Sequence, residues 1–121
     1  MGNFMNLQLR AQTATITTDG SGNGSATLSN VLGEVFAVKV TLGVSMVSAP
    51  LTLTNDSGQT VLTKTISSNG VFNTGSPITT NDGTTAITGA YARYINAGGA
   101  MTATVASGTA NRSLAVTVYY R

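Results

Sequence analysis

Apolar and hydroxyl side chains alternate along much of the chain, and an alternation with a period of two predicts β-strands. Within residues 7–18, Ala14 and Ile16 are expected on one face of a strand, opposite a face of threonines. The clearest element covers residues 35–42, where the apolar face is expected to consist of Phe36, Val38, Val40 and Leu42. Residues 114–120 show the same pattern, with an apolar face formed by Leu114, Val116, Val118 and Tyr120.

Asp-Gly and Asn-Gly pairs interrupt the alternation at short intervals, and both residues of such pairs tolerate the positive φ of tight hairpin turns. Further strands are predicted at residues 26–28, 51–54, 60–66, 71–72 and 101–106. Residues 73–85 are expected to form a loop, and residues 86–97 are the best candidate for a helical turn.

Short strands at short spacing favour a sandwich or a barrel over βαβ units. We therefore expect an all-β fold. Residues 7–121 would form a single antiparallel β-sandwich or jelly-roll-like domain, preceded by an N-terminal arm at residues 1–6. A closed barrel fits the same pattern.

Charge is scarce, and its distribution excludes several function classes. Charged residues make up 8% of the 121 residues, against roughly 25% in average domains. The six basic residues are scattered, so the chain lacks the basic face that nucleic-acid binding requires. No apolar run reaches the roughly 20 residues that span a bilayer, and residues 1–6 lack the pattern of a signal peptide. We expect neither nucleic acid nor a membrane as partner, and synthesis in the cytoplasm.

The chain offers little for catalysis, because it has no histidine and no cysteine and enzymes need a tuned acid, base or nucleophile. Of its four acidic residues, Asp19, Asp56 and Asp82 stand in turn sequences, where such side chains usually bond to the nearby backbone. Glu34 opens the strongest predicted strand, and we prefer an edge-blunting charge to an inter-subunit ion pair. We expect no enzyme, no catalytic residue and no cofactor.

Residues 19–24 are similar to the first half of a calcium loop, with oxygen-bearing residues at the first, third and fifth positions and glycine at the sixth. The twelfth position, which should be glutamate, is Asn30. The flanks are predicted strands and not helices. A hairpin loop without metal is therefore the preferred interpretation.

The apolar residues are mostly small, with seven aromatics and no tryptophan, which indicates a thin core. Such a chain gains from oligomerisation or from docking onto a larger assembly. At residues 116–121 a strand ends in Tyr119 and Tyr120, and tyrosine is enriched at interfaces. This strand is expected to be paired inside a sheet or to lie at an interface.

Four segments resemble the small β-rich virion proteins of tailed bacteriophages that decorate or cement capsids. The resemblance lies in residues 33–38, residues 61–63 with the proline-containing loop after them, residues 96–108, and residues 116–120. It implies a sandwich or jelly-roll domain on the capsid surface of a virion, made in the host cytoplasm and bound to the major capsid protein. It also implies a homo-oligomer, with a trimer favoured.

Contacts with the capsid or with other copies are expected at the arm, the middle of the chain and the last strand. The loops 19–25 and 73–85 are expected to be exposed or to contact the lattice. The predicted interface residues are Met1, Asn3, Phe4, Met5, Phe72, Tyr91, Arg93, Tyr94, Tyr119, Tyr120 and Arg121. The alternative is a carbohydrate- or receptor-binding module of a phage fibre or tail, with Tyr91 and Tyr94 as candidate sugar contacts.

Overall fold

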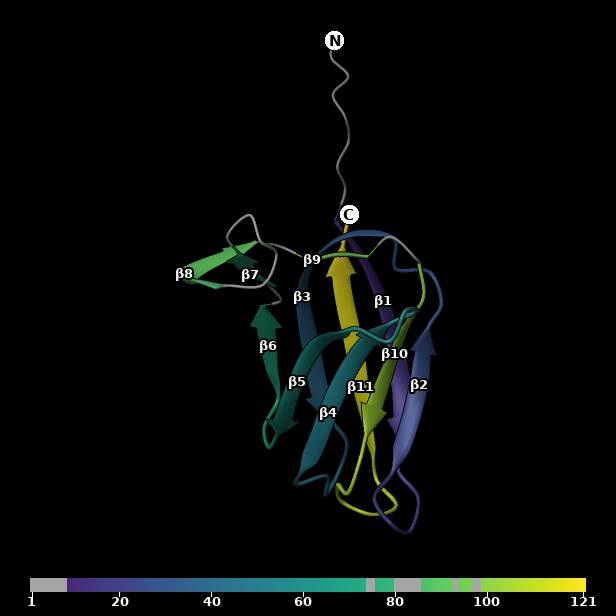
Figure 1. The fold of residues 1–121 in the computed structure, drawn as a ribbon. Coiled ribbons are helices and arrows are strands. Elements are labelled where there is room, and N and C mark those ends of the chain that lie inside the picture. The colour runs from purple at the N-terminus through teal and green to yellow at the C-terminus, as the bar shows by residue number, and fades with distance from the viewer. Residues whose placement is uncertain (1–8, 74–75, 80–85, 93, 97–98) are drawn as a thin grey trace.

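The computed structural model describes residues 9–73, 76–79, 86–92, 94–96 and 99–121, and they form two antiparallel sheets packed face to face (Figure 1). The first sheet has the order β1 (Arg10–Thr17), β11 (Ser113–Tyr120), β3 (Gly33–Leu42) and β6 (Gly70–Asn73), with β9 (Tyr94–Asn96) also paired to β3. The second has the order β2 (Gly24–Leu28), β10 (Met101–Val105), β4 (Ala49–Asn55) and β5 (Thr60–Ile66). The predicted β-sandwich is confirmed.

The strand pairs are nested along the sequence. β4 pairs with β5, β3 with β6, β2 with β10 and β1 with β11. Successive pairs lie in alternate sheets, so the chain resembles one long hairpin rolled into a sandwich. β7 (Ser76–Thr79) and β8 (Ala86–Ala92) pair only with each other among the described strands, and they project from the side of the sandwich (Figure 1).

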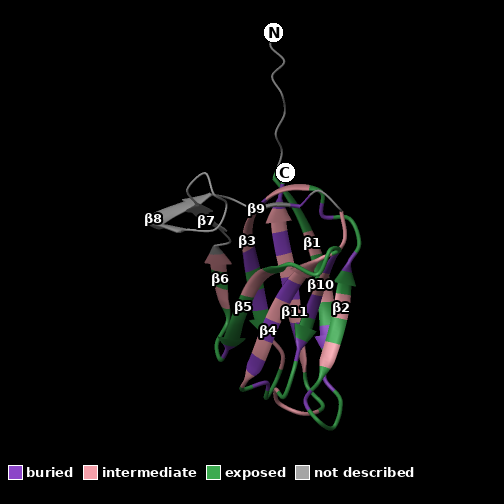
Figure 2. Cartoon of the chain, in the orientation of Figure 1, coloured by how far each residue is buried: buried purple, intermediate pink, exposed green. Residues whose placement is uncertain are grey.

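The core lies between the sheets, and buried and outward residues alternate along β1, β4, β10 and β11 (Figure 2). On β1 and β11 the predicted faces are confirmed: Ile16 is buried, Ala14 is partly buried, and the apolar side of β11 is buried along its whole length. Hydroxyl residues occupy the opposite sides. The β-branched, half-buried pattern therefore specifies both the strands and their orientation.

The prediction for β3 is wrong at one residue. The register shifts between Tyr119, which pairs with Ala37, and Tyr120, which pairs with Val35. The β-bulge lies at Phe36, and as a result Val35 enters the core while Phe36 lies outside it. Further along the strand, Val38 and Val40 are buried as predicted.

Two predictions in the middle of the chain are also wrong. The segment 86–97, the best candidate for a helical turn, contains strands β8 and β9. Residues 76–79, expected as loop, form β7. In the described part of the chain there is no helix long and apolar enough to cross a bilayer.

Candidate functional site

At the end of the sandwich opposite Arg121, three loops lie together: 18–23 between β1 and β2, 43–48 between β3 and β4, and 106–112 between β10 and β11 (Figure 1). We call them the linked loops, because hydrogen bonds join them to one another. Since loops positioned by a rigid scaffold often carry function, this end is a candidate functional site.

Asp19 organises the first linked loop. Its Oδ1 accepts the backbone N–H groups of Ser21 at 2.8 Å and Asn23 at 3.0 Å. The bonds from Asn23 and Ser21 hold the pKa of the Asp19 carboxyl below its ordinary value of 3.8. The predicted turn role of Asp19 is confirmed, whereas the equivalent role near Asp56 is performed by Asn55, whose Oδ1 accepts two backbone N–H groups.

Thr18 connects the first loop to the third. Its hydroxyl donates to the carbonyl oxygen of Thr109 at 2.6 Å and accepts the N–H of Arg112 at 3.0 Å. The side chain is 3% exposed. Asn23 adds a bond from the opposite side, because its Oδ1 accepts the N–H of Ser107 at 2.8 Å. Hydrogen bonds from both Thr18 and Asn23 therefore join the first loop to the third.

Thr109 connects the third loop to the second. Its Oγ1 accepts the N–H groups of Val47 at 3.1 Å and Ser48 at 3.0 Å, and the Gly43 N–H bonds to the carbonyl oxygen of Ser113 at 2.8 Å. Met46 is buried in the core. These anchors leave Val44 and the Val47 side chain in solvent, 91% and 67% exposed.

Backbone strain gathers at the same end. Among the described residues, three that are not glycine have positive φ: Ser45 at 64°, Ser107 at 56° and Asn111 at 53°. All three lie in the linked loops. Such conformations cost free energy and persist only where the surroundings impose them, which often marks a functional segment.

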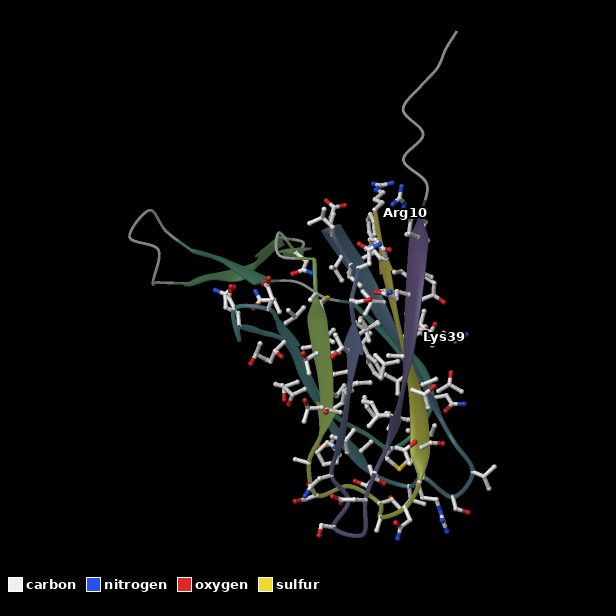
Figure 3. All side chains as sticks on the ribbon, turned by 90° about the vertical axis from the view of Figure 1, so that its right-hand side faces the viewer. Arg10 and Lys39 are labelled. Atoms are coloured by element: carbon white, nitrogen blue, oxygen red, sulfur yellow. The ribbon has the colours of Figure 1, made fainter. Side chains whose placement is uncertain are left out.

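The outer faces of the two sheets differ. On the second sheet, residues directly opposite one another form two rows of hydroxyl side chains: Thr27, Thr102, Thr54 and Thr60 in one row, and Ser25, Thr104, Thr52 and Thr63 in the next. The outer face of the first sheet also carries hydroxyl residues, such as Thr13 opposite Thr117. In addition it carries Tyr119, opposite Ala11 and Ala37, and the exposed Lys39, which points away from the core (Figure 3).

On the side of the sandwich between β5 and β6, a lysine lies over an aromatic ring. Lys64 lies opposite Leu51, so it sits on the inner face of the edge strand β5. Its Nζ lies 5.5 Å from the ring centroid of Phe72 on β6. An inward-pointing lysine also protects an edge strand from pairing with other chains.

Glu34 is not the edge-blunting charge that we expected, because β3 is an interior strand at this point. Its backbone N–H and carbonyl both bond to Arg121, at 2.9 Å and 3.0 Å. The Arg121 guanidinium lies 4.0 Å from the Glu34 carboxylate and 4.6 Å from the ring centroid of Phe36. This group fastens the end of β11 to the start of β3.

The predicted interface residues do not form one surface within the described residues. Tyr120 is 7% exposed and belongs to the core, Tyr119 is half-buried on an outer face, and Phe72 faces Lys64. Tyr91 and Tyr94 lie in β8 and β9. Outside the described residues lie Met1, Asn3, Phe4, Met5 and Arg93, and the interface role of the whole set stays a prediction.

Sequence reasoning missed Val44 and Val47. Both follow the strand ending at Leu42, and Gly43 separates them from its alternation. Two valines in a short serine-containing loop are a detectable signal, because apolar residues outside any predicted strand lack an obvious place in the core.

Comparisons with known proteins give likenesses of fold and no family. No family model matches the chain, and no curated protein matches it. A chain of the cyanophage Pam1 capsid asymmetric unit is similar over 100% of this chain and 91% of its own length, with 17% identity and a TM-score of 0.49. A chain of infectious bursal disease virus strain Gx is similar over 91% of this chain and 39% of its own, with 14% identity and a TM-score of 0.22. At these values neither likeness assigns a function.

Proposed function

We propose that this chain is a structural virion protein that decorates or cements a bacteriophage capsid by binding the lattice of the major capsid protein. Its place is then the capsid surface, and it is not an enzyme. A homo-oligomer is part of the proposal, with the trimer that the sequence resemblance favours.

The observation that carries the proposal is the nested strand pairing. The pairing of the first strands with the last, in alternate sheets, supports a jelly roll, an architecture that viral capsid domains use repeatedly. Because one architecture hosts many functions, the surface must also fit the role.

The surface of the described residues fits a passive role. It offers no group of three or more metal-ligating side chains, and the side-chain oxygen that shapes loop 19–23 is occupied by backbone N–H groups. The outer rows of threonine and serine present hydroxyls and methyls without charge. Such faces suit close packing among neighbours on a particle, where many weak contacts act together.

The test is co-sedimentation of the protein with shells of the major capsid protein encoded in the same genome. We expect saturable binding at a fixed number of copies per shell, and light scattering of the free protein should give a multiple of its 12.3 kDa mass. Absence of binding at any concentration would overturn the proposal.

A second candidate is the carbohydrate- or receptor-binding module, because jelly rolls also include lectin domains. The observation that favours it is Tyr119, half-buried on an outer face beside Thr117. Glycan-array binding that disappears in Tyr119→Ala, with unfolding unchanged, would favour this candidate over the capsid role.

A further inference from the structure

The linked loops expose two apolar side chains, Val44 and Val47. Val44 and Val47 flank Met46, which is buried in the core, so the loop sends one side chain inward and leaves two outside. Exposing a valine instead of burying it forgoes about 1.5 kcal/mol or more. Single exposed valines are common, but these two belong to one short loop that hydrogen bonds hold in place.

The loop is held in this conformation before any partner arrives. Ser45, between Val44 and Met46 in the chain, has a φ of 64°. The Thr109 hydroxyl and the Ser113 carbonyl fix the loop from the neighbouring segment. Binding by a fixed loop loses little conformational entropy, which is the main advantage of preorganisation.

The small exposed area of Val44 and Val47 and the charges of the linked loops indicate which kind of partner they fit. Two valines cover far less than the roughly 800 Å² per partner of a standard stable interface, so they do not by themselves support a dimer of this chain. The charged residues of the linked loops are Asp19 and Arg112, one of each sign. The loops therefore lack the basic cluster that binds membrane surfaces. A weak contact becomes effective where the partner surface repeats and many copies bind together.

We propose that the linked loops are the docking end of this chain, with Val44 and Val47 seated in apolar depressions of a repeating protein shell. The inference rests on the proposed capsid role and adds which end of the sandwich faces the shell. The end that holds Arg121 and the β7–β8 pair then points away from it.

The experiment compares three proteins on the same capsid shells. The double variant Val44→Asp/Val47→Asp places two carboxylates in the contact, and we expect its affinity to fall at least about tenfold, as for central apolar contacts. The matched control is Leu32→Asp, because Leu32 is 58% exposed at the opposite end. We expect the control to bind within about twofold of the unaltered protein, since exposed residues outside a contact contribute little.

Each outcome decides between the two proposals. If the unaltered protein does not bind the shells, the capsid role fails and this inference falls with it. If the unaltered protein and the double variant bind equally well, the docking end is wrong and the capsid role stands. Equal losses in the double variant and in Leu32→Asp would also overturn the docking end.

A second variant tests preorganisation without touching the valines. Thr109→Val removes the oxygen that accepts the Val47 and Ser48 N–H groups. We expect weaker shell binding from a protein that still unfolds cooperatively, because the loop must then be ordered on binding. Unchanged affinity in a folded Thr109→Val protein would contradict the role of the fixed loop.

Discussion

Loop 19–23, between β1 and β2, and loop 55–59, between β4 and β5, have the same internal hydrogen bonds at opposite ends of the sandwich (Figure 1). In each, the first side chain accepts the N–H groups two and four residues later. In each, the fourth residue is a glycine with positive φ, 81° at Gly22 and 84° at Gly58. The sequences Asp-Gly-Ser-Gly-Asn and Asn-Asp-Ser-Gly-Gln share the residues that these bonds require.

The two loops differ in their surroundings. Loop 19–23 bonds to loop 106–112, through the Gly22 carbonyl and the Asp19 carbonyl among others, whereas a side chain at Gly58 would meet no atom within 4 Å. The same turn motif is therefore isolated in loop 55–59, whereas in loop 19–23 it is hydrogen-bonded to a neighbouring loop. The turn motif gives the loop its shape, whereas the neighbouring segments determine how much of the protein's stability depends on the loop.

The largest expected difference comes from replacing the two glycines with alanine. At Gly22 a Cβ would collide with the backbone of Gly108, and we expect a loss of about 4 kcal/mol from strain and overpacking together. At Gly58 only the left-handed conformation opposes alanine, at about 1 kcal/mol. Urea unfolding of both variants measures the difference. Equal losses would mean that loop 19–23 is not locked by its neighbour.

A smaller difference is expected for the threonines that precede the two loops. Thr18→Val deletes a buried hydroxyl that bonds to Thr109 and Arg112, and we expect a loss of about 2 kcal/mol. Thr54→Val deletes only a long 3.4 Å bond, and we expect about 0.5 kcal/mol at most. Thermal unfolding of the pair checks this, and a Thr54→Val loss as large as that of Thr18→Val would contradict the comparison.

Hydrogen exchange should separate the loops without any substitution. The N–H groups of Gly108 and Asn111 bond to carbonyls of loop 19–23, so their exchange requires opening of two loops at once. The Ser57 and Gln59 N–H groups need only loop 55–59 to open. We expect at least about tenfold slower exchange at Gly108 and Asn111. Similar rates at all four positions would indicate that the linked loops open separately.

The smallest effect is a difference in acid sensitivity. Hydrogen bonds lower the folded-state pKa of Asp19 below 3.8, so the contribution of this carboxylate is present above that pH and is lost as the pH falls through the lowered value. Asn55 has no charge to lose. Asp19→Asn should flatten the pH dependence of the unfolding temperature below about pH 4, and Asn55→Asp should steepen it. An unchanged profile in Asp19→Asn would contradict the role of the charge.

The strands could be predicted from the sequence because their information is local. The alternation of threonine and apolar residues at 13–16 predicts a strand and also which side chains lie on each of its faces. The bulge at Phe36 could not be predicted, since it depends on how β11 aligns with β3. The same holds for Lys64, whose inner position follows from its pairing with Leu51.

In the candidate site, too, local features could be predicted from the sequence and long-range contacts could not. The turn role of Asp19 is visible in five consecutive residues. The bonds of Thr18 to Thr109 and Arg112 join residues that are 91 and 94 positions apart, and no local pattern reports them. The exposure of Val44 and Val47 depends on hydrogen bonds that hold their loop in place, so the sequence alone does not predict it.

The nested pairing also determines when this protein can fold. β11 is made after every other strand of the described chain, yet it lies between β1 and β3 in the middle of its sheet. A ribosome-bound chain that lacks β11 leaves both neighbouring strands unpaired and one side of the core open to water. Folding must therefore wait until the final strand has emerged, and the long sequence separation of its contacts makes that step slow.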